Sequence, residues 1–190
     1  DLGLNTSEKT ALMTYHPVTL ETQISAKDQI QNVFDAIEGY DLQVIITAPN
    51  MDNENNIILE EINKRKENNK YRFVPSLGAE RYLSLLRYVE FVIGNSSSGI
   101  LEVPYFKIST INIGKRQDGR IRHRSIIDCD YDKASVSKSI DKALSTDFRE
   151  SLKDVDYKFG DGTASKKMIE AIKSVKDRKD LMIKKLEFPC

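Results

Sequence analysis

One short stretch of the chain has the residue types that bind anionic groups. The apolar run Phe91–Ile93 leads into Gly94-Asn95-Ser96-Ser97-Ser98-Gly99, and Glu102 follows three residues later. This order predicts a buried strand, a loop, and a helix whose start is marked by serines. Amides in the first helical turn lack an internal partner, and small residues let a phosphate approach them closely. Glu102, about one turn into the helix, would then accept hydrogen bonds from ribose hydroxyls. The alternative is an ordinary helix cap followed by a first-turn carboxylate.

A histidine follows the first predicted strand. His16 precedes Pro17, which keeps the chain extended and ends the strand there. The imidazole would lie at the edge of a sheet, where it donates to a phosphate oxygen or handles a proton. The alternative is a structural histidine whose ring is satisfied by a backbone carbonyl.

Two arginines lie four residues apart around a glycine, after the fifth predicted strand. Guanidinium groups such as those of Arg116 and Arg120 suit phosphate oxygens and keep their charge at any relevant pH. The alternative is a solvated basic turn. The positive character continues through Arg122, His123 and Arg124, which we expect to lie mainly on the surface and outside the site.

Short apolar runs alternate with longer segments of helical period, which is typical of a parallel sheet covered by helices. The predicted strands are Ala11–Tyr15, Gln43–Thr47, Tyr71–Val74, Phe91–Ile93, Thr110–Ile113 and Ser125–Cys129. The predicted helices are Thr19–Ile37, Glu54–Lys66, Ala79–Tyr88, Asp132–Leu144 and Ser165–Lys176. We therefore expect an α/β fold with a doubly wound parallel sheet, in one domain that covers residues 1–190.

Polar groups follow five of these strands. Each strand end carries one: His16, Asn50, the Val74–Pro75 backbone, the serines 96–98 and Arg116. Ligands of open α/β sheets bind outside the carboxyl ends of the strands, so we expect these groups to form one site.

The composition excludes several classes of function. Lys plus Arg and Asp plus Glu number 29 each, so no electrostatic footprint for nucleic acid or an anionic membrane is present. Two cysteines and two distant histidines make neither a disulfide framework nor a metal-ligand set. We find no Walker loop or dinucleotide motif and expect no cofactor. The absence of a leader or a long apolar run leads us to expect a cytoplasmic protein. Residues 1–9 lack an initiator methionine and suggest the remnant of a linker.

Three segments resemble those of a known family, the hydrolysing UDP-N-acetylglucosamine 2-epimerases. They are TYHPVTLE at Thr14–Glu21, GNSSSGILE at Gly94–Glu102 and NIGKRQDGR at Asn112–Arg120. The resemblance covers roughly residues 10–172, with the motifs in order. It implies one Rossmann-like half of a two-domain enzyme of the glycosyltransferase-B type, namely the carboxyl-terminal half that holds the nucleotide. Such enzymes convert UDP-N-acetylglucosamine and water into N-acetylmannosamine and UDP for sialic or related nonulosonic acid synthesis.

The resemblance also implies a role for each site residue. Ser96 and Ser97, with the neighbouring Ser98 and Gly99, would hold the diphosphate, and Glu102 the ribose. The following residues would complete the UDP site: the backbone of Phe73 and Val74 at the uracil, Asn50 in the same pocket, and Arg116, Arg120 and His16 at the diphosphate. His16 would be the residue nearest to catalysis, because it would stabilise UDP as it leaves.

The resemblance implies that the family's carboxylates for proton removal and water activation lie in an amino-terminal domain, which we expect to be outside these 190 residues. We therefore expect the fragment to be inactive alone, with that domain as its missing partner and a homodimer when complete. The sequence TYHPVT, where the non-hydrolysing epimerases typically have THRRE, favours the hydrolysing class by analogy. Three alternatives stay open: a non-hydrolysing epimerase, half of a glycosyltransferase of the same fold, and a stand-alone module that binds nucleotide sugars.

Overall fold

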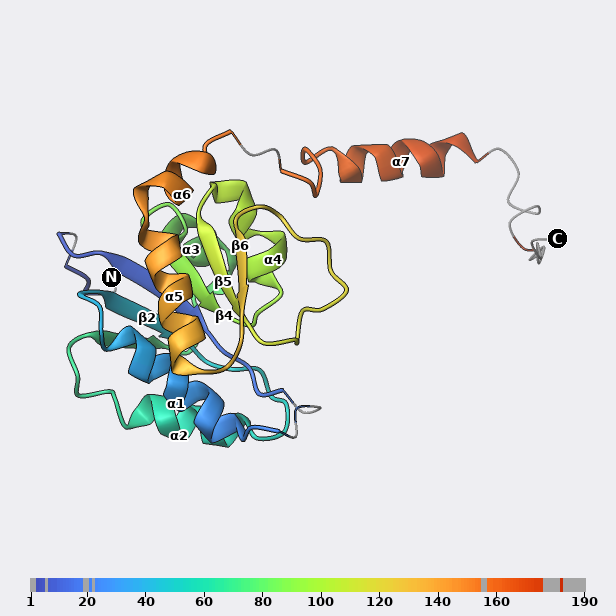
Figure 1. The fold of residues 1–190 in the computed structure, drawn as a ribbon. Coiled ribbons are helices and arrows are strands. Elements are labelled where there is room, and N and C mark those ends of the chain that lie inside the picture. Colours follow the sequence, from blue (N-terminus) through green and yellow to red (C-terminus); the bar gives the residue numbers. More distant parts are fainter. Residues whose placement is uncertain are drawn as a thin grey trace. The chain divides into compact units, whose positions relative to one another are not determined.

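The computed structural model describes residues 3–5, 7–18, 21, 23–154, 157–175 and 182. The chain divides into two compact units, Asp1–Asp156 and Tyr157–Cys190. The first unit contains a six-stranded sheet in the order β3-β2-β1-β4-β5-β6. All neighbouring strands are parallel (Figure 1). This order reverses direction between β1 and β4, as in doubly wound nucleotide-binding folds, and the predicted fold class is confirmed.

The strands lie close to their predicted positions. They are β1 (Thr10–Thr14), β2 (Gln43–Thr47), β3 (Tyr71–Val74), β4 (Phe91–Gly94), β5 (Ser109–Ile113) and β6 (Ile126–Cys129). The helices of the first unit are α1 (Ala26–Ile37), α2 (Asn55–Asn63), α3 (Gly78–Leu85), α4 (Ser98–Leu101), the 3-10 helix η1 (Val103–Phe106), α5 (Lys133–Leu144) and α6 (Thr146–Ser151).

The sheet is covered on both faces. Successive side chains of each strand point to opposite sides, so β1 and β4 each contribute to two cores. In β1, Met13 packs into a core built with α1, α2 and α5, and its neighbour Leu12 packs into a second core with α3 and η1. In β4, Ile93 and Val92 divide between the two cores in the same way. Figure 1 shows α1, α2 and α5 together on one face. Burial on both faces explains why the central strands are continuous apolar runs.

Several helix boundaries differ from the prediction. Helix α1 begins at Ala26 because the Ser25 hydroxyl accepts the backbone N–H of Asp28 and caps the helix. The predicted start at Thr19 was wrong, although residues 19, 20 and 22 lie outside the described residues. Helices α2 and α3 each end three residues earlier than predicted, and α6 was not predicted. A short helix of six residues has too little apolar periodicity to be recognised in sequence.

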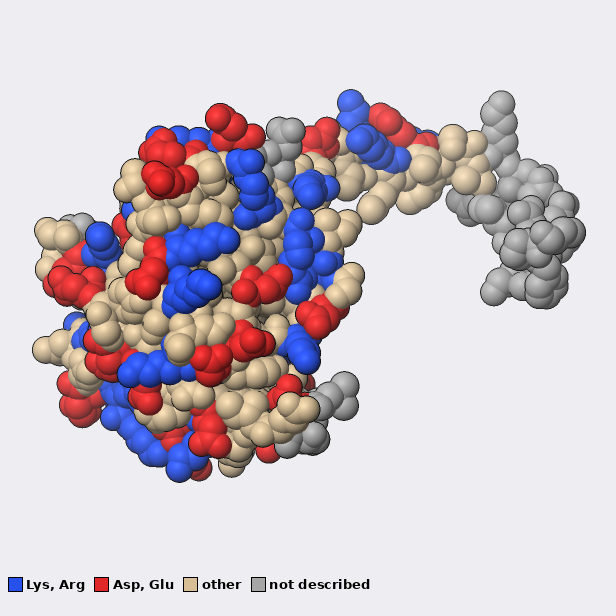
Figure 2. Space-filling view, viewed as in Figure 1, with Lys and Arg blue, Asp and Glu red and all other residues tan. Residues whose placement is uncertain are grey.

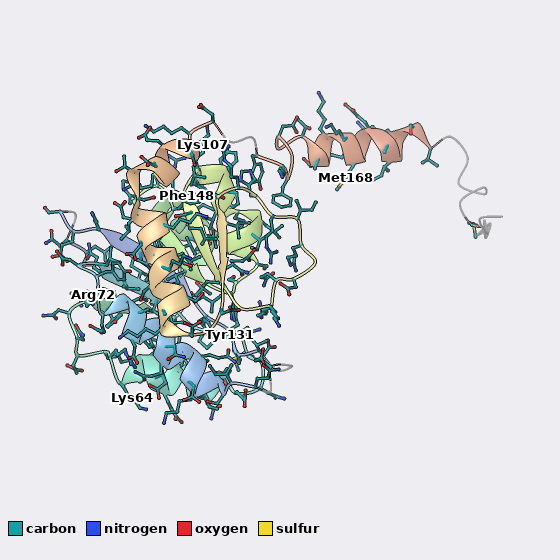
Figure 3. The ribbon with its side chains drawn as sticks, viewed as in Figure 1. Lys64, Arg72, Lys107, Tyr131, Phe148 and Met168 are labelled. Carbon is teal, nitrogen blue, oxygen red and sulfur yellow. The ribbon has the colours of Figure 1, made fainter. Side chains whose placement is uncertain are left out.

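The second unit contains helix α7 (Ala164–Ser174), close to the predicted Ser165–Lys176, whose last residue lies outside the described residues. None of its residues is buried within the part of the chain that the structure describes. Its apolar side chains Met168, Ile169 and Ile172 are exposed, and Met168 is labelled on this helix in Figure 3.

Acidic and basic side chains are interspersed over the face formed by α1, α2 and α5 (Figure 2). One surface prediction was wrong: His123 is 2% exposed, and its Nδ1 lies 3.4 Å from the Ser125 hydroxyl. The neighbouring Arg122 is half-buried, and its Nε donates to both carboxylate oxygens of Asp128 at 3.2 and 3.0 Å. Arg124 is exposed, as predicted. Among the described helices, none combines the length and hydrophobicity needed to span a bilayer.

Candidate functional site

The carboxyl ends of β1, β2, β4 and β5 meet at one edge of the sheet. The register places Thr14 beside both Thr47 and Gly94, and Gly94 beside Asn112. Gly94 has a φ of +139°, and a Cβ there would lie 1.9 Å from the carbonyl oxygen of Thr14. Only glycine tolerates this conformation and this close approach. The loops that follow β1 and β4 therefore begin side by side.

Asn95 joins these loops and is fully buried, with 0% of its surface exposed. Its Oδ1 accepts the backbone N–H of His16 at 2.7 Å, and its Nδ2 donates to the His16 carbonyl oxygen at 2.8 Å. This pair of hydrogen bonds imitates a strand pairing and fixes the backbone of the histidine. A buried amide with its donor and acceptor both satisfied is a rigid support.

The ring of His16 is also held. The backbone N–H of Asn50, after β2, donates to His16 Nδ1 at 2.9 Å. Burial of the ring and the nearby Arg116 guanidinium lower the pKa of His16 from 6.5 to about 4, against a smaller opposing effect of Asp52. His16 is therefore neutral in solutions near pH 7.

Two side chains from the loop after β5 reach the same asparagine. Arg116 Nη1 and Gln117 Nε2 donate to the Asn95 carbonyl oxygen at 3.1 and 2.8 Å. Arg116 Nη2 also lies 4.0 Å from the half-exposed Asp52 carboxylate. The guanidinium keeps further N–H groups for an anion, because it has five donors in total. Asn95 thus supports both the backbone of His16 and the side chain of Arg116.

A cavity of about 330 Å³, called here the smaller cavity, opens beside His16. It is lined by Thr14, His16, Thr47, Ala48, Pro75, Ser76, Leu77, Gly78, Ala79, Tyr82, Ser96, Ser98 and Glu102. The Tyr82 and Ser98 hydroxyls lie 2.6 Å apart, and burial raises the pKa of Tyr82 to about 12. The phenol is therefore a neutral hydrogen-bonding group. The cavity combines an apolar rim from the 75–79 loop with hydroxyls and one carboxylate, which suits a nucleoside.

A second cavity of about 620 Å³, called here the larger cavity, is strongly charged. It is lined by Pro17, Val18, Glu21, Asp52, Ser97, Lys115, Arg116, Gln117, Arg120 and Tyr131. Tyr131, labelled in Figure 3, follows β6, and its hydroxyl accepts the backbone N–H of Lys115 at 3.3 Å. Adjacent residues of the same loops line the two cavities, His16 and Ser96 the smaller, Pro17 and Ser97 the larger. The loops after β1 and β4 therefore form a wall between them.

The serine segment differs from the predicted helix start. Helix α4 has only four residues, and its N-cap Ser97 makes no side-chain capping bond. Instead, the Ser96 hydroxyl accepts the Ser98 N–H at 3.4 Å. Glu102 follows the end of α4 rather than lying within a longer helix. Pro104 explains the break, since proline has no N–H and restricts the residue before it.

Gly99 has a packing role. A Cβ at this position would lie 2.7 Å from Thr110 Cγ2, and the Thr110 hydroxyl donates to the Gly99 carbonyl oxygen at 2.7 Å. The glycine therefore lets α4 lie directly on β5.

The structure brings most of the predicted site residues together. His16, Ser96, Ser98 and Glu102 line the smaller cavity; Ser97, Arg116 and Arg120 line the larger one; Asn50 contacts His16. Phe73 lies elsewhere, in a hollow with Ile46, Ile62 and Lys66, and Val74 packs on the second core. Because these two side chains lie elsewhere, only the backbone of Phe73 and Val74, which leads into residues 75–79, stays a candidate for contacts with the base.

Sequence reasoning missed four residues of the site. Asn95 and Gln117 lie inside two of the three motifs but were assigned no role, and Tyr82 was expected only as part of the helix Ala79–Tyr88. Asp52 was not noticed, although it lies two residues after Asn50. Buried backbone N–H and C=O groups still need hydrogen-bond partners where a strand ends. An asparagine directly after a buried strand can supply them, and this is the signal that would have identified Asn95. Among the described residues, no group of three His, Cys, Asp or Glu side chains is arranged to hold a metal ion.

Comparison with known proteins gives a consistent result. Residues 3–173 match the family described as UDP-N-acetylglucosamine 2-epimerase. The chain is 38% identical over 131 residues to the polysialic acid biosynthesis protein P7 of Escherichia coli, covering 68% of this chain and 33% of that protein. It is 32% identical over 179 residues to the hydrolyzing UDP-N,N'-diacetylbacillosamine 2-epimerase of Legionella pneumophila, covering 91% of this chain and 45% of that protein.

A solved structure shows the same fold. The UDP-GlcNAc 2-epimerase of Neisseria meningitidis, bound to UDP-GlcNAc, superimposes with a TM-score of 0.74 at 12% identity. The superposition covers 90% of this chain and 46% of that one. This chain thus spans a third to a little under a half of the relatives that it matches.

The sheet order and the two polar cavities at its carboxyl edge define an α/β domain of the doubly wound, Rossmann-like class. Within that class, the match over residues 3–173 assigns the family. The chain belongs to the UDP-N-acetylglucosamine 2-epimerase family.

Proposed function

We propose that this chain is the UDP-binding part of a hydrolysing UDP-N-acetylglucosamine 2-epimerase, which converts UDP-N-acetylglucosamine and water into N-acetylmannosamine and UDP. The observation that carries the proposal is the pair of cavities separated by a wall that bears His16, Ser96 and Ser97. Family membership and the name of the hydrolyzing Legionella relative support the reaction class.

The cavities suggest how the ligand lies. The uridine would occupy the smaller cavity, with the ribose hydroxyls at Glu102 and the base against the 75–79 loop. The diphosphate would cross the wall between His16 and Arg116, and the sugar would enter the larger cavity. An apolar rim with a few placed polar groups is the usual composition of a small-molecule site.

The chemistry assigned to this part of the enzyme is stabilisation of the leaving group. Elimination of UDP leaves negative charge on the diphosphate, and a guanidinium and an imidazole N–H aimed at that charge lower the barrier. Removal of the proton at sugar carbon 2 needs a base on the opposite side of the sugar. We assign that base to an amino-terminal domain, so the chain alone is expected to release no N-acetylmannosamine. By analogy with the family that the motifs resemble, we also propose that the complete enzyme is a homodimer.

A second candidate substrate has a specific observation in its favour. The Legionella relative carries the name UDP-N,N'-diacetylbacillosamine 2-epimerase, and it covers 91% of this chain. This sugar carries a second acetamido group, which would have to fit in the larger cavity. The nucleotide half of the ligand is the same in both cases, so the UDP proposal does not depend on the choice of sugar.

Titration calorimetry with the 190-residue chain tests the proposal. We expect UDP to bind more tightly than UMP, which lacks the second phosphate, and more tightly than ADP, which carries the wrong base. Equal binding of UDP and ADP would contradict a uracil site, and equal binding of UDP and UMP would contradict a diphosphate site. Full-length protein, assayed for N-acetylmannosamine release from UDP-N-acetylglucosamine, tests the reaction itself.

A further inference from the structure

The hydrogen bond on His16 Nδ1 fixes the chemical form of the ring. The donor is the backbone N–H of Asn50, at 2.9 Å, and a backbone amide nitrogen has no other role than to donate. Nδ1 must therefore hold a lone pair, so the proton of the neutral ring is on Nε2. The ring then carries its N–H on the side opposite Asn50, and His16 lines the smaller cavity.

The backbone of His16 is fixed independently of its ring. The side chain of the fully buried Asn95 makes two hydrogen bonds to it, at 2.7 and 2.8 Å. The carbonyl oxygen of Asn95 also receives the Arg116 guanidinium at 3.1 Å. One residue therefore fixes the backbone that carries the uncharged donor and also anchors the cation.

We propose that Asn95 is a positioning residue and that His16 acts as a neutral Nε2–H donor to an anionic oxygen of the ligand, while Arg116 supplies the positive charge. The identity of that ligand as a nucleoside diphosphate rests on the function proposed above. The form of the ring does not, because it follows from contacts within the protein.

The charged groups around the ring agree with His16 as the neutral donor and Arg116 as the cation. Arg116, from the loop after β5, opposes protonation, and Asp52, from the loop after β2, favours it. Glu102, after α4, lines the same cavity, and Glu21 lines the neighbouring one. Burial acts in the same direction as the guanidinium, and together they lower the pKa of His16 to about 4. In the free chain, His16 is therefore neither a cation near pH 7 nor a hydrogen-bond donor through Nδ1.

Nitrogen NMR of the free chain tests the ring directly. Long-range ¹⁵N–¹H correlation spectra distinguish the Nε2–H tautomer, the Nδ1–H tautomer and the imidazolium. Only His16 and His123 contribute ring signals, and the spectrum of His16→Gln assigns them. We expect the Nε2–H tautomer with no titration between about pH 5.5 and 8. An Nδ1–H tautomer, or an imidazolium at about pH 6.5, would overturn the proposal.

A pair of substitutions tests the donor in the ligand complex. The amide nitrogen of Gln reaches the position of Nε2, whereas that of Asn corresponds to Nδ1. We expect His16→Gln to bind UDP at least about tenfold more tightly than His16→Asn. Equal affinities for the two variants would refute a specific donor at Nε2.

Asn95→Asp tests the positioning role, because it removes the Nδ2 donor and places a carboxylate beside His16. We expect the His16 signals to titrate at a higher pH than in the wild type, with UDP binding weakened by at least about tenfold near pH 8. Asn95→Ser, which introduces no charge, replaces it if Asn95→Asp does not fold, with the same loss of affinity expected. Unchanged binding with an unchanged ring spectrum would refute the role of Asn95. If UDP fails to bind wild-type chain that shows the Nε2–H ring, the proposed function fails and the assignment of the ring stands.

Discussion

Replacing Arg116 by alanine gives the most direct measurement of how this site holds an anion. The guanidinium lines the larger cavity, with one N–H on the Asn95 carbonyl oxygen at 3.1 Å and a distance of 4.0 Å to the Asp52 carboxylate. Arg120 lines the same larger cavity but is exposed to solvent. The two arginines therefore form a matched pair. They carry the same charge, but Arg116 is held by the Asn95 carbonyl oxygen, whereas Arg120 is exposed to solvent.

The structure sets the expected size of the effect. A hydrogen bond to a charged group is worth about 1.5–3 kcal/mol, which corresponds to a loss of affinity of about 10- to 150-fold for Arg116→Ala. Loss of the contact with the half-exposed Asp52 changes the stability of the free chain by no more than about 1 kcal/mol. An exposed arginine such as Arg120 acts mainly through screened charge, so Arg120→Ala is expected to lose no more than about fivefold.

Titration calorimetry with UDP at two salt concentrations distinguishes the two arginines. We expect the affinity of the Arg120→Ala protein to approach that of the wild type as salt rises, because only a screened interaction was removed. The loss in Arg116→Ala should persist. If Arg120→Ala costs more than Arg116→Ala, the wrong arginine has been placed at the diphosphate and the proposed path of the ligand between the cavities is refuted.

Three further predictions follow from single contacts. Glu102→Ala should weaken UDP binding by about 1–3 kcal/mol, and unchanged affinity in calorimetry would remove the ribose assignment. Gly94→Ala should lower the free energy of unfolding by about 2–5 kcal/mol in urea titrations, with Gly39→Ala, whose Cβ meets only an ordinary 3.5 Å contact, as the near-neutral control. Since the pKa of His16 falls from 6.5 unfolded to about 4 folded, its contribution to stability is present above pH 6.5 and lost as the pH falls toward 4. His16→Gln should therefore show a smaller loss of stability between these pH values, and an identical loss would contradict the neutral buried ring.

The sequence predicted the layers of the fold because each strand carries its own signal. β2 and β3 lie at the predicted residues, since buried parallel strands are continuous apolar runs bounded by polar turns. The helix ends were less predictable. Ser25 caps α1 and sets its start, and Pro104 ends the short helix before it, although the apolar periodicity continues past both positions. Both effects are local, so both helix ends could be predicted from the sequence.

The candidate site was predictable in its membership but not in its internal contacts. Residues that follow the strand ends were expected to meet, and His16 and Ser96 do line one cavity. The hydrogen bonds of Asn95 join residues that are 79 and 21 positions apart in the chain. Such pairings depend on the strand order and register, which apolar patterns alone do not specify. The backbone of Phe73, inside β3, was placed at the uracil by the family resemblance alone, and its side chain lines a different hollow, so that assignment stays a prediction.

The arrangement of His16 and Arg116 separates two tasks that a single cationic histidine would have to combine. An imidazolium in this pocket would add charge, but its binding of a diphosphate would weaken as the pH rises through its pKa. The guanidinium keeps its charge at every relevant pH, and burial of the ring together with the nearby guanidinium lowers the pKa of His16 to about 4. The ring is thereby held in the form that Asn50 also selects, a neutral donor with a fixed direction. Charge and direction at the diphosphate thus come from different residues, and both depend on the one buried side chain and carbonyl of Asn95.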